Sequence, residues 1–393
     1  MIDRDMALLL RKVAREQPVV TLSGPRQSGK TTLCKAAFPD KPYVTLEDSD
    51  AFEFADTDPK GFLAQFPRGA ILDEVQNVPR IFSQLQVLVD DQPKPGQWIL
   101  TGSQELEMSA RASQSLAGRT GVLTLLPPSW AELQRFPRHP KSLHDVLWKG
   151  AYPRIHNRRL DPARWLAAYV RTYIERDVRR LLKVTDLLTF QTFLKMCAAR
   201  AGQLLNLAGL AADCGITQPT AKSWMSVLEA SFIVFRLPPF HRNWGKRLVK
   251  APKLYFHDSG LLCWLLGIRE SAALRHHALR GAVFESWVAS EIVKARRNRG
   301  LEPDLMHYRD RSGMEVDLVL ERGENLTAIE VKSGETVSSD FFKNLETLKD
   351  LAHTRGNRRH TVERIVIYGG SERQTREQGR LMPWRAIDEE DWS

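Results

Sequence analysis

Cysteine is scarce in this sequence, with four in 393 residues, and none of them lies in a C-x-x-C pair. Such wide spacing argues against a zinc site or a disulfide framework. Isolated thiols are typical of proteins in a reducing compartment, so we expect a cytoplasmic location. The four are Cys34, Cys197, Cys214 and Cys263.

Long apolar runs are missing as well. No uninterrupted run reaches the roughly 18 residues that a membrane-spanning helix requires, so we expect no membrane partner. Near the start of the sequence, the apolar segment 6–10 is bounded by charged residues on both sides. It is too short for the apolar core of a signal peptide.

Acidic residues are outnumbered, with 47 Asp and Glu against 57 Lys and Arg, and the formal net charge is +10. An excess of positive charge indicates an anionic partner, for which nucleic acid is the leading candidate. With 42% hydrophobic and 26% charged residues, the composition is that of a globular protein. The length predicts about two to four domains.

A glycine-rich loop, Gly24-Pro-Arg-Gln-Ser-Gly-Lys-Thr31, fits the pattern G-x-x-x-x-G-K-[ST]. It lies between a run predicted as a buried strand (18–23) and a segment predicted as a helix (32–37), the context this motif requires. Backbone N–H groups can wrap a polyphosphate, while Lys30 neutralises its charge and the Thr31 hydroxyl binds Mg²⁺. The predicted nucleotide-binding residues are Gly24, Pro25, Arg26, Gln27, Ser28, Gly29, Lys30, Thr31 and Thr32.

Strand-like runs alternate with helical stretches from residue 18 to about 126, which predicts a mostly parallel sheet with both faces covered. The third run ends in Asp73-Glu74. Acids at the end of a buried strand are costly without a partner, and a metal–nucleotide complex supplies one. We expect Asp73 to hold Mg²⁺ and Glu74 to polarise the attacking water; the alternative is a solvated turn.

Two further residues are candidates for the nucleotide site. Ser103 follows the fourth run, at the same edge of the predicted sheet, and could sense the γ-phosphate. Arg119 could stabilise transition-state charge as a finger, in cis or from a neighbouring subunit. The alternative for Arg119 is an ordinary surface charge.

A helix-turn-helix is predicted over residues 204–229. Gly215 ends its first helix, Thr217 can cap the second, and Pro219 suits a first turn. A strand-like run and a basic segment (241–247) follow and suggest a winged version that reads DNA. The second helix carries one cation, so a packing role stays open. The predicted DNA-binding residues are Lys222, Arg242, Lys246 and Arg247.

The C-terminal region shows helical and strand-like segments in the order α-β-β-β-α-β. Its predicted strands carry Asp317, Glu330 and Lys332, and its first helix carries Glu285. Three acids and a lysine can perform metal-dependent phosphodiester hydrolysis: the acids would bind Mg²⁺ or Mn²⁺ and Lys332 would activate water. The alternative is an ordinary solvated strand with alternating charge.

The order of the N-terminal motifs resembles the AAA+ class of P-loop ATPases. It is most similar to a bacterial and archaeal family in which such a core is fused to an uncharacterised C-terminal domain. The resemblance implies ATP binding and hydrolysis, and assembly into a ring or other homo-oligomer. The matching segments are 24–32, 72–76, 100–103 and 117–119, continuing through 150–153, 173–177, 258–260 and 330–332.

The segment 313–317 together with Glu330-Val-Lys332 resembles the PD-(D/E)XK nuclease superfamily, and most of all its branched-DNA resolvases. This resemblance implies cleavage at Glu285, Asp317, Glu330 and Lys332. One departure is Val316, where the pattern has proline. Members of the superfamily can also keep the fold as a DNA clamp or docking platform, so cleavage stays open.

These observations predict an α/β protein in four parts: an AAA+ P-loop core with a parallel sheet (1–135), a helical lid or linker (136–186), a winged helix-turn-helix (187–250) and a restriction-endonuclease-like α/β domain (251–393). The leading interpretation is a DNA-associated ATPase that remodels or cleaves DNA, including branched DNA. The alternative is a nucleotide-gated switch whose C-terminal domain performs no chemistry.

Overall fold

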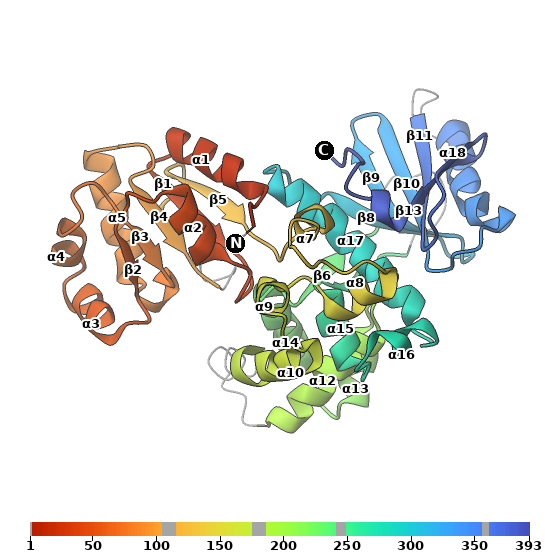
Figure 1. The fold of residues 1–393 in the computed structure, drawn as a ribbon, viewed down its shortest axis with the longest axis horizontal. Coiled ribbons are helices and arrows are strands. Elements are labelled where there is room, and N and C mark those ends of the chain that lie inside the picture. The colour runs from red at the N-terminus through yellow and green to blue at the C-terminus, as the bar shows by residue number, and fades with distance from the viewer. Residues whose placement is uncertain (1, 104–114, 175–185, 241–248, 356–360) are drawn as a thin grey trace.

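The computed structural model describes residues 2–103, 115–174, 186–240, 249–355 and 361–393. Figure 1 shows three parts: an N-terminal sheet unit, a helical unit and a C-terminal sheet unit. The two sheet units lie on opposite sides of the molecule, with the long helix α17 (Arg280–Asn298) between them. No helix in these described ranges is both long and apolar enough to cross a membrane.

The N-terminal unit is a five-stranded sheet in the order β2-β3-β4-β1-β5, with every neighbouring pair parallel. One face packs against an apolar cluster that includes Phe82 and Leu85, and the other against a cluster that includes Leu10 and Leu33. The predicted parallel sheet with two covered faces is therefore confirmed. Its elements are α1 (Met6–Glu16), β1 (Val19–Ser23), α2 (Lys30–Ala37), β2 (Tyr43–Thr45), α3 (Ser49–Thr57), α4 (Pro59–Ala64), β3 (Ile71–Asp73), η1 (Val75–Asn77), α5 (Arg80–Asp91), β4 (Trp98–Thr101) and β5 (Thr120–Thr124).

The helical unit contains the segments predicted as a helix-turn-helix. Gly215 lies in the left-handed region with φ of +66°, and the Thr217 side chain accepts from the Thr220 backbone N–H. Strands β6 and β7 pair antiparallel, so the predicted boundary at residue 250 falls between two paired strands. The elements are α7 (Trp130–Leu133), α8 (Leu143–Lys149), α9 (Pro153–Arg158), α10 (Pro162–Tyr169), the π-helical turn η2 (Val170–Ile174), α12 (Leu187–Ala199), α13 (Leu207–Asp213), α14 (Gln218–Ala230), β6 (Val234–Leu237), β7 (Lys253–Phe256), α15 (Ser259–Leu265) and α16 (Ser271–Arg275).

The C-terminal unit is a six-stranded mixed sheet in the order β12-β13-β11-β10-β9-β8. Strands β9 and β10 form an antiparallel pair, whereas β10 and β11 are parallel and are joined through α18. The predicted α-β-β-β-α-β order is present, and two further strands follow it. The elements after α17 are β8 (Leu305–Arg309), β9 (Glu315–Arg322), β10 (Asn325–Lys332), η3 (Ser339–Phe342), α18 (Lys343–Arg355), β11 (Thr361–Tyr368), β12 (Gln374–Arg376), β13 (Gly379–Pro383) and η4 (Trp384–Ala386).

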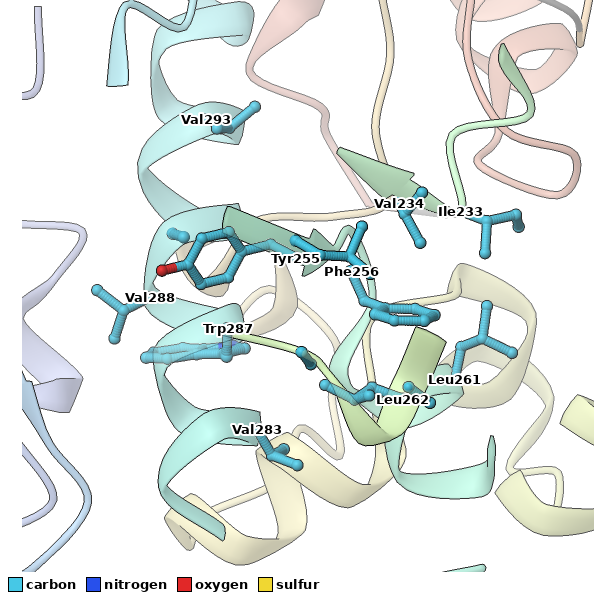
Figure 2. Close-up of a cluster of buried hydrophobic side chains, with 14 of the residues drawn as sticks. Ile233, Val234, Tyr255, Phe256, Leu261, Leu262, Val283, Trp287, Val288 and Val293 are labelled. Carbon is cyan, nitrogen blue, oxygen red and sulfur yellow. The ribbon is translucent and has the colours of Figure 1, made fainter. Parts of the chain in front are cut away.

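A single apolar cluster joins the helical unit to the C-terminal unit. Figure 2 shows its centre: Tyr255 of β7 lies against α17 near Trp287 and Val288, while Phe256 turns toward Leu262 of α15. Successive side chains of a strand point to opposite faces, so one short strand contacts both helices. The interface between the two units is thus a continuous core.

Candidate functional site

The glycine-rich loop connects β1 to α2, and its conformation requires both of its glycines. Gly24 has φ of +149°, and a Cβ placed there would lie 2.2 Å from the Leu125 carbonyl oxygen. Gly29 has φ of +100° at the N-terminal cap of α2. Side chains are strained or sterically excluded at both positions, so the loop keeps a shape in which the start of a helix follows directly.

Lys30 lies over this loop. Its Nζ donates to the Gly24 carbonyl at 2.8 Å and to the Pro25 carbonyl at 3.0 Å, and the residue is 5% exposed. Burial lowers the pKa of the Lys30 ammonium. An ammonium has three donor protons, so Lys30 can exchange its bonds to the loop carbonyls for bonds to phosphate oxygens.

Thr31 and Asp73 lie side by side at the ends of α2 and β3. The Thr31 hydroxyl donates to Asp73 Oδ2 at 2.8 Å, and the Tyr43 hydroxyl donates to the same oxygen at 2.8 Å. The Thr101 hydroxyl donates to the other carboxylate oxygen. A hydroxyl and a carboxylate are hard oxygen donors of the kind that Mg²⁺ prefers. The residues therefore fit a magnesium ion held by Thr31 and Asp73.

Glu74 follows Asp73 in the left-handed region, with φ of +55° and ψ of 42°. Its Oε2 accepts from the Ser103 hydroxyl at 3.0 Å and from the Gln76 amide at 2.5 Å, and Oε1 lies 4.0 Å from Arg26 Nη1. A non-glycine residue in this region costs about 1–3 kcal/mol, and such residues are enriched at functional sites. The structure places Ser103 beside Glu74, at the sheet edge where both were predicted.

Lys30, Thr31, Asp73 and Glu74 line a cleft of about 1440 Å³. Its opposite wall comes from the helical unit, where Arg154, Asn157 and Arg158 project from α9. The cleft thus brings the phosphate-binding loop, Asp73 and Glu74 together with the arginines of α9. The sequence predicted no role for the α9 arginines, because nothing local distinguishes them from other basic residues.

Arg4, in the N-terminal segment, contacts the loop. Its role was also not predicted from the sequence. Its guanidinium donates to the Ser28 carbonyl at 2.8 Å, to the Leu126 carbonyl at 2.7 Å and to Glu132 at 2.9 Å. Arg4 therefore ties the loop to the segment that leaves the sheet unit.

Arg119 lies at the end of the sheet opposite to the glycine-rich loop, which corrects the prediction that it acts as a finger in cis. It directly precedes β5, whose first residue pairs with Val19 at the start of β1, whereas the loop follows the end of β1. Five strand residues at about 3.3 Å each separate the two edges by roughly 16 Å. The Arg119 guanidinium instead donates to Asp90, with Nη2 2.9 Å from Oδ2. A finger acting on a neighbouring subunit stays a prediction.

The predicted DNA contacts are only partly described. Lys222 is exposed on α14, next to exposed Ser223. Arg242, Lys246 and Arg247 lie outside the described residues.

The C-terminal candidate residues lie close together. Asp317 Oδ2 accepts from the Val331 N–H at 2.9 Å, and Lys332 Nζ donates to Glu330 Oε1 at 2.5 Å. Burial and the charge of Asp317 raise the pKa of Glu285 to about 7 and that of Glu330 to about 8. Glu330 Oε2 is buried and has no hydrogen-bond partner in the described part of the chain. This is an electrostatically crowded group of acids.

A second cation at these acids is Lys253 of β7, which was not predicted from the sequence. Its Nζ lies 3.0 Å from Glu285, 2.5 Å from Glu315 and 3.7 Å from Asp317. Within the described ranges, no three or more His, Cys, Asp and Glu side chains are arranged to hold a metal ion. Binding of Mg²⁺ or Mn²⁺ by Glu285, Asp317 and Glu330 therefore stays a prediction. The feature of the sequence that could have indicated Lys253 is its position as the first residue of an otherwise apolar strand.

Three family models match consecutive parts of the chain: an "AAA domain" (AAA_14) over residues 16–134, a "domain of unknown function" (DUF8612) over 140–272, and another (DUF4143) over 280–387. Together with the loop geometry, the first shows that the N-terminal unit is a P-loop ATPase domain of the AAA kind.

Among solved structures, the Walker-type ATPase paby2304 of Pyrococcus abyssi is 14% identical, covers 67% of this chain and 96% of its own, and has a TM-score of 0.44. The RuvB Holliday junction branch migration motor of Thermotoga maritima is 19% identical, covers 60% of this chain and 90% of its own, and has a TM-score of 0.33.

Two curated proteins are each 33% identical to the chain over 342 residues, which is 85% of this chain and 75% of each relative. They are the uncharacterized proteins Rv2008c of Mycobacterium tuberculosis (strain ATCC 25618 / H37Rv) and Mb2031c of Mycobacterium bovis (strain ATCC BAA-935 / AF2122/97). The chain belongs to the same family as these two proteins.

Proposed function

We propose that this protein hydrolyses ATP and uses its nucleotide state to control a contact with DNA. The observation that carries the ATPase part is the assembly of Lys30, Thr31, Asp73 and Glu74 in one cleft. The loop alone would support nucleotide binding. A carboxylate beside the loop adds the group that can polarise water.

In the proposed reaction each residue acts on a stated atom. The Lys30 ammonium binds the β- and γ-phosphate oxygens. Thr31 and Asp73 would hold Mg²⁺, which would neutralise charge on the phosphates. The Glu74 carboxylate accepts a hydrogen bond from the attacking water, and Ser103 orients that carboxylate. The proton of the water moves toward Glu74 as the bond to the γ-phosphorus forms and the bond to the leaving oxygen breaks.

The same cleft supports coupling to the helical unit. Its wall includes α9, and the Tyr169 hydroxyl at the end of α10 lies 3.4 Å from the Arg26 carbonyl within the loop. Negative charge of a bound nucleotide attracts Arg154 and Arg158. Hydrolysis and phosphate release therefore change the force on the unit that carries α13 and α14.

DNA is the proposed partner on grounds of charge. The net charge of +10, the exposed Lys222 on α14 and the basic segment between β6 and β7 support an electrostatic contact with phosphates. The test is a panel of single-stranded, duplex, forked and four-way DNA assayed for binding and for stimulation of ATP turnover. If no DNA in the panel bound or stimulated ATP turnover, DNA would be excluded as the partner, while the proposal of ATP hydrolysis would stand.

Neutralising the basic segment should weaken DNA binding and flatten its salt dependence. We expect Arg242→Ala, Lys246→Ala and Arg247→Ala in combination to reduce the slope of log K against log salt by about 0.9 for each DNA phosphate that the variant no longer neutralises. The matched control removes three exposed cations of the sheet unit, Lys60, Arg68 and Lys94. Fluorescence anisotropy over a salt series measures both; an equal change in the two variants would exclude the segment as the DNA-binding surface.

Metal-dependent DNA cleavage is a second candidate. It is favoured by the close approach of Asp317, Glu330 and Lys332 on neighbouring strands. The position of Lys253 favours the alternative, a C-terminal unit without chemistry. The same DNA panel with Mg²⁺ or Mn²⁺ tests it, since products should form only if the acids bind a metal.

A further inference from the structure

Lys253 is a buried cation, unlike most lysines. It is 2% exposed, and its ammonium contacts three carboxylates, those of Glu285, Glu315 and Asp317, at 3.0, 2.5 and 3.7 Å. A buried ammonium is stable only with good partners, because its loss of hydration is costly. The cluster supplies these partners from two elements, α17 and β9.

The backbone holds Lys253 in this place. It pairs with Leu237 of β6 and forms a bridge with Leu204, and the next residue, Leu254, exchanges backbone hydrogen bonds with Gly202 at 2.7 Å and Gln203 at 3.0 Å. Two residues further along the strand, on the same face, the Tyr255 hydroxyl donates to Glu285 at 2.5 Å. Lys253 is thus anchored by a strand and not by a mobile loop.

Two further oxygens of the predicted ligands have partners within the chain, whereas Glu330 Oε2 has no hydrogen-bond partner among the described residues. Asp317 Oδ2 accepts from the Val331 N–H, and Glu330 pairs with Lys332. A divalent cation would need several of these oxygens at once. It would also lie beside a buried positive charge, and such like charges repel strongly where the dielectric constant is low. Binding of a metal and the observed position of Lys253 therefore exclude one another.

We propose that Lys253 is the resident counter-ion of this cluster, so that Glu285, Asp317 and Glu330 bind no divalent metal in the full chain. The ion-paired cluster then fastens β7 of the helical unit to α17 and to the C-terminal sheet. The C-terminal unit serves as a rigid attachment for the helical unit. This inference is independent of ATP hydrolysis and contradicts the cleavage candidate.

The test is a titration of the nucleotide-free full chain with Mn²⁺, followed by electron paramagnetic resonance. We expect no saturable Mn²⁺ binding that depends on Asp317, and therefore identical curves for the wild type and for Asp317→Asn. A wild-type Mn²⁺ site that disappears in folded Asp317→Asn or Glu330→Gln would overturn the proposal. This comparison tests for metal binding at the cluster without any change to Lys253.

Removal of the ammonium gives the complementary result. Lys253→Met should free three carboxylates and create one Mn²⁺ site, which a second change, Asp317→Asn, should abolish. The matched control is Lys294→Met, which removes a lysine equally buried at 2% exposure but paired with the single acid Glu291; it should gain no site. A folded Lys253→Met protein without Mn²⁺ binding would overturn the exclusion. ATP turnover, measured in parallel, reports separately on the proposed function.

Discussion

Replacing Glu74 with glutamine should reduce ATP turnover by about 100-fold or more while leaving ATP affinity within a few-fold of the wild type. The reason is that the amide cannot take a proton from the attacking water, and general-base catalysis contributes about 10²–10⁴-fold. Glutamine keeps the size of the side chain and can still bond to Ser103. A steady-state phosphate-release assay measures turnover, and a fluorescent ATP analogue measures binding.

Glu47 offers a matched control for this change. It lines the same cleft, lies 3.5 Å from the same guanidinium of Arg26, and its side chain is 53% exposed. Glu47→Gln therefore makes the same chemical change near the same arginine, and we expect it to alter turnover by only a few-fold. If both variants lost turnover equally, the general charge of the cleft and not Glu74 would be responsible.

Replacing Lys30 with alanine should weaken ATP binding by roughly 100-fold or more. Each hydrogen bond to a charged group contributes about 1.5–3 kcal/mol, and Lys30 Nζ can give at least two to the phosphates in place of its bonds to Gly24 and Pro25. The fold should persist, because the change removes a buried charge. Titration of the fluorescent ATP analogue gives the affinity, and circular dichroism checks folding.

The control for Lys30 is Lys35, one turn further along the same helix. It is exposed and its Nζ lies 3.4 Å from the centre of the Tyr43 ring. Lys35→Ala removes the same charge from α2 without touching the loop, so ATP affinity should change little. Unchanged affinity in Lys30→Ala would contradict a phosphate role for the loop.

The nucleotide site was predictable because its chemistry is local. One loop contains the phosphate-binding groups, and parallel strands bring Asp73 and Ser103 to one edge, which a sequence pattern can anticipate. Arg119 shows the limit of this reasoning. A motif next to a strand does not reveal at which end of the sheet it lies, and here it lies at the end away from the loop.

The C-terminal cluster shows a different limit. Alternation along β10 correctly placed Glu330 and Lys332 on one face, and the predicted order of elements is present. Lys253 belongs to another strand, 32 residues before Glu285, and reaches the acids only through the packing of β7 against α17. No local pattern contains that contact. The sequence therefore indicated the acids and Lys332 but missed the second cation, Lys253.

The contacts between the ATPase domain and the remainder of the chain could not be predicted from the sequence either. Arg4 connects the loop to Leu126 and Glu132, and the α9 arginines complete the cleft from the helical unit. These residues lie far from the loop in sequence. In the proposed function they would make the nucleotide a shared ligand of two units, and this would be the physical basis for coupling ATP to a partner of the helical unit.

The most direct test of that coupling is the affinity of the Glu74→Gln protein for DNA, with and without saturating ATP, at one salt concentration. The variant should hold ATP unhydrolysed, so the nucleotide state is defined during the measurement. We predict that ATP changes the dissociation constant for DNA by about tenfold, which corresponds to a coupling free energy of about 1.4 kcal/mol. Equal dissociation constants with and without ATP would contradict control of a DNA contact by the nucleotide.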